Sequence, residues 1–200
     1  MTLSIPFGIL PAMNNADRIL SIALKEFAVR GYEAVGVQEI VDAAGVTKPT
    51  LYHYFGGKQG VLEELIKRKT SGFLQSFSIA CTYQHDLTYT LEKILRSVLS
   101  FAVNDPVFFR YYAAMRYAPA KSTEKECVAL TLSMINSQLL ALFTASGFEH
   151  GNIRGKEEVL AVTFWGFCVE VALLLIEGKL TMEDDLAYQM KRYFEFGIYS

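Results

Sequence analysis

The sequence predicts an all-α protein, and three observations point to that fold class. Apolar residues recur at helical spacing along most of the 200 residues, and no segment shows the period of two that a half-buried strand requires. Stretches containing glycine or proline separate these periodic segments. Hydrophobic residues make up 52% of the chain, so it can bury a sizeable core rather than remain disordered.

Three short helices are expected near the N-terminus. The first spans about 17–30 and ends at Gly31, which has the position of a left-handed C-cap. The second spans 37–44 and stops at Gly45, and the third begins after Thr47. Because the glycine turn between the last two is so short, they are predicted to form a helix-turn-helix.

Longer helices follow, and aromatic residues become more frequent. We expect these helices at about 58–77, 85–103, 106–117, 123–146, 156–177 and 183–196. The change in helix length and composition predicts three parts of the chain. They are a flexible N-terminal arm at 1–14, a helix-turn-helix domain at 15–60 and a larger helical domain at 61–200.

Charge and cysteine content exclude several classes of protein. Charged residues make up 20% of the chain and the net charge is -2, so a contact with a polyanion requires a local basic patch. The three cysteines are far apart and have no histidine at metal-ligand spacing, so we expect reduced thiols, no metal and no cofactor. The N-terminal segment lacks a basic region and contains Pro6 and Pro11, which predicts a cytoplasmic protein without a signal peptide.

The segment 159–176 is apolar enough to resemble a membrane span, but it contains Glu170. A helix buried in a core or a subunit interface gives the same pattern, and we favour an interface between two copies of the chain and no membrane contact. A carboxylate in such a helix should be paired, either with a cationic ligand or with Arg110 or Arg116. Of these, pairing within the fold is preferred.

The third expected helix carries the most specific surface in the sequence. If Thr47 is its N-cap, Leu51, Tyr54 and Phe55 share one face and anchor the helix, with the Tyr54 hydroxyl at the edge. The outer face then holds a cation, hydroxyl groups and an imidazole but no carboxylate. Such groups suit phosphates and base edges, although they also occur on ordinary half-exposed helices. The outer residues are Lys48, Pro49, Thr50, Tyr52 and His53.

The segment from Ala16 to Leu65 resembles the DNA-binding domain of the TetR family of transcriptional regulators. The matching motifs are A-x-x-x-F-x-x-x-G-Y from residue 23, I-x-x-x-A-G-V from residue 40 and T-x-x-T-L-Y-x-Y-F from residue 47, followed by Lys58. The resemblance covers about the first third of the chain. It implies a ligand-responsive homodimer, most often a repressor, that binds a palindromic operator in double-stranded DNA. The residues expected at the operator are Gln38, Thr47, Lys48, Pro49, Thr50, Tyr52, His53, Tyr54 and Lys58.

The resemblance also implies that the remaining helices form an effector-binding and dimerisation domain. The last two helices should pack against their twins, and a small, mainly hydrophobic effector should move the fourth helix and release the DNA. Candidate pocket residues are Phe101, Phe108, Phe109, Tyr112, Met115, Tyr117, Phe143, Phe164, Trp165, Cys168 and Glu170.

Gly36 and Gly57 depart from the family pattern, in which Ser, Thr or Asn often caps a helix. We therefore expect intact helices but fewer phosphate contacts, and Gly60 should loosen the start of the fourth helix. An enzyme is disfavoured, because no phosphate loop, G-x-S-x-G or H-E-x-x-H motif occurs. The remaining alternative is a small-molecule-binding or interaction protein that keeps the helix-turn-helix as a scaffold.

Overall fold

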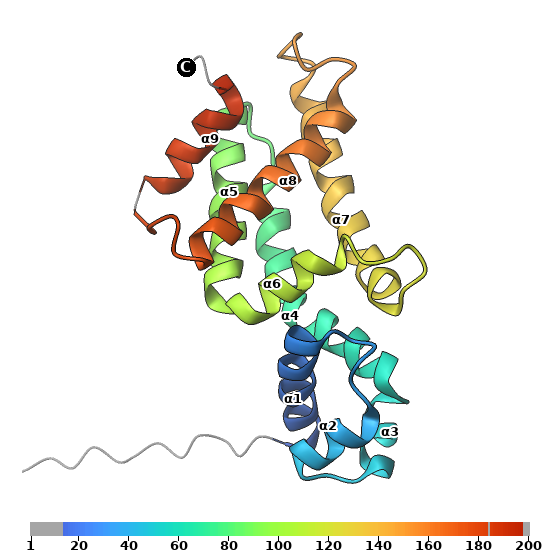
Figure 1. The fold of residues 1–200 in the computed structure, drawn as a ribbon. Coiled ribbons are helices and arrows are strands. Elements are labelled where there is room, and N and C mark those ends of the chain that lie inside the picture. Colours follow the sequence, from blue (N-terminus) through green and yellow to red (C-terminus); the bar gives the residue numbers. More distant parts are fainter. Residues whose placement is uncertain (1–13, 184, 198–200) are drawn as a thin grey trace, which may run out of the picture. The chain divides into compact units, whose positions relative to one another are not determined.

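The computed structural model describes residues 14–183 and 185–197, and within them every regular element is a helix (Figure 1). The predicted all-α class is confirmed. The predicted arm at 1–14 lies outside the described residues, apart from Asn14. The helices are α1 Asn15–Arg30, α2 Val37–Ala44, α3 Lys48–Phe55, α4 Lys58–Ala80, α5 Leu87–Asn104, α6 Pro106–Met115, α7 Thr123–Ser146, α8 Glu157–Ile176 and α9 Leu186–Phe196.

The chain divides into two units at a point inside α4. The N-terminal unit ends at Leu62 and the C-terminal unit begins at Glu63. Because α4 begins at Lys58 and continues without interruption to Ala80, a single helix belongs to both units.

The N-terminal unit is built from three helices around a small apolar core. The helix α1 buries Ile19 and Phe27, α2 buries Ile40, and α3 buries Leu51, all with 1% exposure or less. Both α2 and α3 contact α1 and each other. The core thus fixes the orientation of α3 although this helix has only eight residues, too few for stability in isolation.

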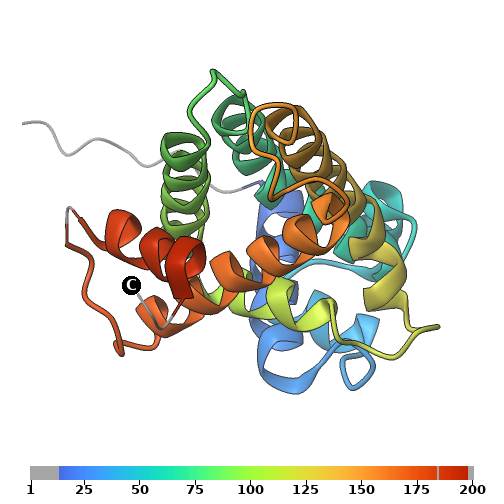
Figure 2. The ribbon, with the colours of Figure 1, turned by 90° about the horizontal axis from the view of Figure 1, so that it is seen from above.

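In the C-terminal unit, α8 lies between α5 and α7, while α9 packs mainly on α5 (Figures 1 and 2). One face of α8 supplies the fully buried Phe164, Trp165 and Cys168 to the core. The Trp165 ring meets Phe77 of α4 edge to face, with 5.9 Å between the ring centroids. Aromatic side chains thus connect α8 to α4.

The opposite face of α8 is exposed, so this helix is not buried on all sides within one chain. Val159 and Val162 are 68% and 42% exposed. Glu170 is also exposed, and within the described residues it forms no ion pair with Arg110 or Arg116. The pKa of Lys179 is raised mainly by its hydrogen bond with Glu177, and the charge of Glu170 helps to raise it. The structure contains two helices, α7 and α8, that are long and apolar enough to cross a membrane by length and composition, but core helices of soluble proteins share this property.

Candidate functional site

The turn between α2 and α3 is fixed by backbone hydrogen bonds and by a side-chain cap. Gly45 has a left-handed conformation with φ of 63°, and its N–H donates to the Asp42 carbonyl. The N–H of Val46 donates to the Val41 carbonyl at 3.0 Å. Thr47 then caps α3, since its Oγ1 accepts a hydrogen bond from the Thr50 N–H at 3.4 Å. These contacts set the direction in which α3 leaves the turn.

The outer face of α3 is open to solvent and carries no carboxylate. Lys48, Pro49 and His53 are exposed, Tyr52 is 52% exposed and Thr50 is half-buried. The N-terminal amides of α3 and the Lys48 ammonium both favour negative charge near the start of this helix. The predicted face is therefore present on one surface.

Tyr54 is not the core anchor that the helical register predicted, because it is 50% exposed. Leu51 is buried and Phe55 is half-buried, so these two residues anchor the helix. The Tyr54 ring lies at the edge of α3, against the rings of His53 and Phe55 at centroid distances of 5.5 and 6.0 Å. Its exposed side joins the surface that was predicted to contact DNA.

Four of the predicted contact residues already have side-chain hydrogen bonds within the protein, and in two of them, Thr47 and Thr50, the hydroxyl groups bond each other at 2.9 Å. Lys58 donates to the Tyr32 carbonyl at 2.9 Å, and its ammonium lies 4.0 Å from the centroid of the Tyr32 ring. Gln38 donates its side-chain amide to Asp42 at 2.7 Å. An ammonium has three donors, so Lys58 keeps donors for a phosphate, whereas Gln38 must leave Asp42 to turn its amide towards a base.

Sequence reasoning missed Arg18 of α1 as a member of this surface. Its guanidinium lies so close to the turn that a Cβ atom on Gly45 would come within 2.8 Å of Arg18 Nη2. Arg18 is exposed, and no ion pair to it is found in the described part of the chain. The sequence pattern did not show that Arg18 lies near Gly45, because Arg18 belongs to α1 whereas Gly45 follows α2.

The absence of a capping side chain at Gly36 is offset by Glu39. The Glu39 carboxylate accepts the Gly36 N–H at 2.7 Å and pairs with Arg30 at 2.7 Å. The Gly36 N–H and the Arg30 guanidinium together hold the pKa of Glu39 below its ordinary value of 4.5. The N-terminus of α2 is thus capped by the Glu39 side chain of its first turn, which binds the backbone N–H of Gly36, the residue that precedes the helix.

A close contact that the sequence did not reveal explains why position 60 is a glycine. A Cβ atom at this position would lie 1.8 Å from the Phe55 carbonyl oxygen. The close approach of α4 to the end of α3 therefore requires a glycine here. The expected loosening of α4 by Gly60 is not its main consequence, because the glycine allows the close packing of α4 against the end of α3.

Most of the aromatic residues proposed for an effector pocket form a filled core. Phe101, Phe108, Phe109, Tyr112, Met115, Phe143, Phe164, Trp165 and Cys168 are all at most 9% exposed. A cavity next to Phe109, Tyr112 and Trp165 has a volume of about 10 Å³, which is enough for at most one water molecule. Tyr117 and Glu170 do not join this cluster, since Tyr117 is 78% exposed and Glu170 is exposed on α8.

One polar atom in this core has no partner. The Tyr112 hydroxyl has no hydrogen-bond partner within the described residues, although the side chain is 2% exposed. Burial raises the pKa of this hydroxyl, and the neighbouring Arg116 opposes the rise. The hydroxyl stays protonated and can serve as a donor if the core opens.

The large hollows of the C-terminal unit lie beside the aromatic core. A groove of about 730 Å³ between α4 and α5 is lined by Phe73 and Phe101 together with polar and basic residues; we call it the α4–α5 groove. A second hollow, of about 580 Å³, is lined by Phe143 and residues of α5, α9 and the segment before α8. Each hollow therefore includes one of the predicted pocket residues.

The chain is similar to several regulators of bacterial transcription. The family described as bacterial regulatory proteins, tetR family, matches residues 19–65. The HTH-type transcriptional activator FasR of Mycolicibacterium smegmatis is 23% identical over 188 residues, which cover 94% of this chain and 84% of FasR. The HTH-type transcriptional repressor KstR2 of Rhodococcus jostii is 41% identical over 56 residues, which cover 28% of this chain and 26% of KstR2.

Among solved structures, the chain resembles a transcriptional regulator FadR from Bacillus subtilis in complex with stearoyl-CoA. The TM-score is 0.70 at 19% identity, and the match covers 90% of this chain and 98% of FadR. This likeness concerns the fold. The matches to the tetR family and to KstR2, in contrast, are confined to about the first third of the chain, where the candidate nucleic-acid surface lies.

Proposed function

We propose that this chain, whose residues 19–65 match the tetR family of bacterial regulatory proteins, is a ligand-responsive homodimeric transcriptional regulator of the cytoplasm, which binds a palindromic DNA operator. The observation that carries this proposal is the outer face of α3. It combines Lys48, Tyr52 and His53 with the positive N-terminal end of the α3 dipole and lacks any carboxylate. Such a face suits the major groove of DNA, where the first residues of a recognition helix reach base edges.

The roles of the side chains follow from their chemistry. Lys48 and Arg18 are cations near the helix-turn-helix turn and are assigned to phosphates, as is the Tyr52 hydroxyl. Pro49 and the Thr50 methyl group are assigned to thymine methyl groups. We propose that the regulator is a repressor, as the name of KstR2 states for that relative, while FasR is named as an activator.

Two copies are proposed to meet through the outward face of α8. Val159 and Val162 are exposed there, and Leu130 on the neighbouring α7 is 73% exposed. Burying such a face against its twin removes apolar area from water and places two copies of α3 for two half-sites. Light scattering at micromolar concentration should give twice the mass of the chain, and a stable monomer would refute this part of the proposal.

The effector is proposed to be a hydrophobic molecule bound in the C-terminal unit, and long-chain acyl thioesters are the class to test first. The support is the fold shared with FadR, which was solved with stearoyl-CoA, and the aromatic lining of the α4–α5 groove. An effector that binds one position of α4 better than the other shifts α4, and with it the DNA-binding unit. The dimer then loses its fit to the operator.

A selection from a random DNA duplex pool, followed by fluorescence anisotropy on the best duplex, tests DNA binding. The variants Lys48→Ala and Tyr52→Ala should each weaken binding by about tenfold, as expected for the loss of a phosphate contact. Tyr89→Ala is the matched control, since Tyr89 is 56% exposed but lies on α5. If the pool yields no enriched sequence, the alternative is favoured, in which the helix-turn-helix is only a scaffold of a small-molecule-binding or interaction protein.

A further inference from the structure

We propose that the α4–α5 groove binds an anionic amphiphile, with its apolar chain beside Phe73 and Phe101 and a phosphate-bearing head at Lys93 and Arg96. The proposal rests on the effector response proposed above and specifies its site and ligand chemistry. With about 730 Å³, the groove has the size of a ligand site, whereas the cavity in the aromatic core does not.

The apolar part of the groove lies between α4 and α5. The Phe73 ring stacks on the Phe101 ring, with 4.3 Å between centroids and 9° between planes. Ile79, near the end of α4, also lines the groove and is 68% exposed. Phe73 and Phe101 are only 5% and 9% exposed, so an alkyl chain reaches their faces by separating the stacked rings, whereas Ile79 already offers aliphatic surface that faces water.

The polar part of the groove is positive. Its lining contains Lys69, Lys93 and Arg96 against a single carboxylate, Asp105, in a chain whose net charge is -2. Lys69 pairs with Asp105 at 2.6 Å and Arg96 with Glu92 at 2.9 Å. Such a local excess of cations favours an anionic group on the ligand.

Lys93 differs from the other two cations because it lacks an acidic partner among the described residues. Its ammonium lies 5.1 Å from the centroid of the Tyr89 ring, and the side chain is half-buried. A half-buried ammonium that is held only by an aromatic face gains a charge-assisted hydrogen bond when a phosphate arrives. Lys93 is therefore the residue on which the head group depends most.

Few polar contacts join α4 to α5 across the groove. Lys69 bonds Asp105, and the hydroxyl groups of Ser76 and Ser97 lie 3.1 Å apart. A chain inserted between Phe73 and Phe101 separates the two helices at the same place. Ligand binding in this groove therefore acts directly on α4, the helix shared by both units.

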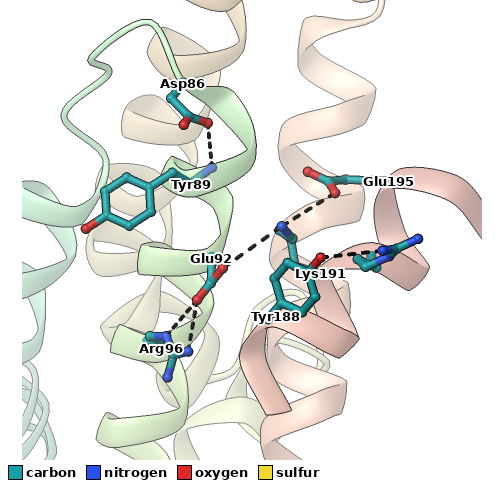
Figure 3. A network of polar contacts seen from close by, with 8 residues as sticks. Asp86, Tyr89, Glu92, Arg96, Tyr188, Lys191 and Glu195 are labelled. Atoms are coloured by element: carbon teal, nitrogen blue, oxygen red, sulfur yellow. Dashed lines mark hydrogen bonds and ion pairs between the residues drawn. The ribbon is translucent and has the colours of Figure 1, made fainter. Parts of the chain in front are cut away.

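Arg96 also links the groove to α9 through a shared carboxylate (Figure 3). Glu92 accepts from Arg96 at 2.9 Å, and its other oxygen lies 4.0 Å from the ammonium of the buried Lys191 on α9. If a ligand phosphate draws the Arg96 guanidinium away, Lys191 remains as the cation beside the Glu92 carboxylate. The contact between α5 and α9 should then tighten when the ligand binds.

Titration of the full chain with stearoyl-CoA tests the site, with stearate and CoA as separate arms. Trp165 is the only tryptophan, and its ring lies 6.4 Å from that of Phe73, so its fluorescence reports on the groove. Calorimetry on the same samples detects binding that leaves the fluorescence unchanged. We expect stearoyl-CoA to bind most tightly. Equal affinity for stearate would overturn the phosphate contact, and equal affinity for CoA would overturn the apolar contact.

Two pairs of variants separate the groove from other sites. Gly72 lines the groove, and a Cβ atom there meets nothing within 4 Å, so Gly72→Phe should fill the groove and abolish binding while Gly72→Ala retains it. Lys93→Gln should weaken stearoyl-CoA binding about tenfold. The control Lys67→Gln, on an 80% exposed side chain of α4 outside the groove, should not.

The outcomes also distinguish the site from the proposed function. If wild type binds stearoyl-CoA and Gly72→Phe binds it equally well, the groove is not the site, although the proposed function stands. If wild type binds its selected duplex but none of the three ligands, the acyl thioester effector fails and the groove proposal fails with it. If both ligand and duplex bind, stearoyl-CoA should release the duplex from wild type and not from Gly72→Phe.

Discussion

The buried ammonium of Lys191 offers a measurable prediction about how α9 is held. The side chain is 2% exposed, and its Nζ lies 3.7 Å from Glu195 and 4.0 Å from Glu92 (Figure 3). Lys191→Met keeps the aliphatic stem and removes the charge. Because the volume is nearly conserved, packing should change by less than about 1.5 kcal/mol.

The size of the expected loss of stability depends on the ion-pair partners that Glu92 and Glu195 keep after the substitution. Unit charges about 4 Å apart attract by about 4 kcal/mol at an effective dielectric constant of 20, but burial of the ammonium costs several kcal/mol, so the two terms largely cancel. After the substitution Glu92 keeps Arg96 at 2.9 Å, while Glu195, at 14% exposure, keeps no ion-pair partner within the described residues. Leaving one such group unpaired costs about 1–3 kcal/mol, so we expect a loss of about 2 kcal/mol.

Urea unfolding followed by Trp165 fluorescence measures this loss in the C-terminal unit, where the only tryptophan lies. The control Lys179→Met removes a 65% exposed lysine paired with Glu177 and should change stability by less than about 1 kcal/mol. The double variant Lys191→Met/Glu195→Gln should recover most of the loss, because no carboxylate is left unpaired. A single variant as stable as wild type, or a double variant as unstable as the single one, would refute this reasoning.

Two further predictions concern the N-terminal unit. Gly60→Ala should lower the free energy of unfolding by about 1–3 kcal/mol through overpacking, and with it the midpoint of thermal unfolding. Gly72→Ala, on the same helix but in the C-terminal unit and with open space at Cβ, should raise the free energy of unfolding by about 0.5–1 kcal/mol. Circular dichroism of both variants checks this, and equal effects would contradict the clash. Glu39 has a lowered pKa, so its cap stabilises the fold above its ordinary pKa of 4.5, and this contribution is lost as the pH falls through the lowered value. Carboxyl NMR should place the Glu39 midpoint below 4.5, and a midpoint at or above that value would contradict the contacts with Gly36 and Arg30.

The helices could be predicted because their start and stop signals are local. Proline at the start of α6 and glycine after α1 and α2 gave boundaries close to those observed, and α4 runs only three residues beyond its predicted end at 77. The outward face of α3 could also be predicted locally, since at about 100° per residue a buried Leu51 places Pro49 and His53 on the opposite side, with Lys48 and Tyr52 on the flank. Tyr54 was misplaced because a helix of eight residues buries few positions, and Leu51 and Phe55 fill them.

The α4–α5 groove could not be predicted in the same way, because a groove depends on the distance between helices. Aromatic residues at helical spacing look alike whether they fill a core or line a pocket, so Phe108 and Phe164 were grouped with Phe101. The exposure of Glu170 could not be predicted for a related reason. A helix that is apolar all round does not reveal which face is turned outward, and Glu170 lies on the exposed face of α8.

The energies of the contacts across the α4–α5 groove favour a response to ligand rather than a rigid joint. The partly exposed Lys69–Asp105 pair contributes up to about 1 kcal/mol, the Ser76–Ser97 hydrogen bond about 1 kcal/mol and the stacked rings of Phe73 and Phe101 about 1 kcal/mol. The three together come to about 3 kcal/mol, and a ligand that separates the helices must offset this cost from its own contacts with the groove, which lowers its affinity by about a hundredfold. In the proposed response, a ligand that gains more than this cost from the groove breaks these contacts on binding and so acts on α4, the helix that continues into the N-terminal unit.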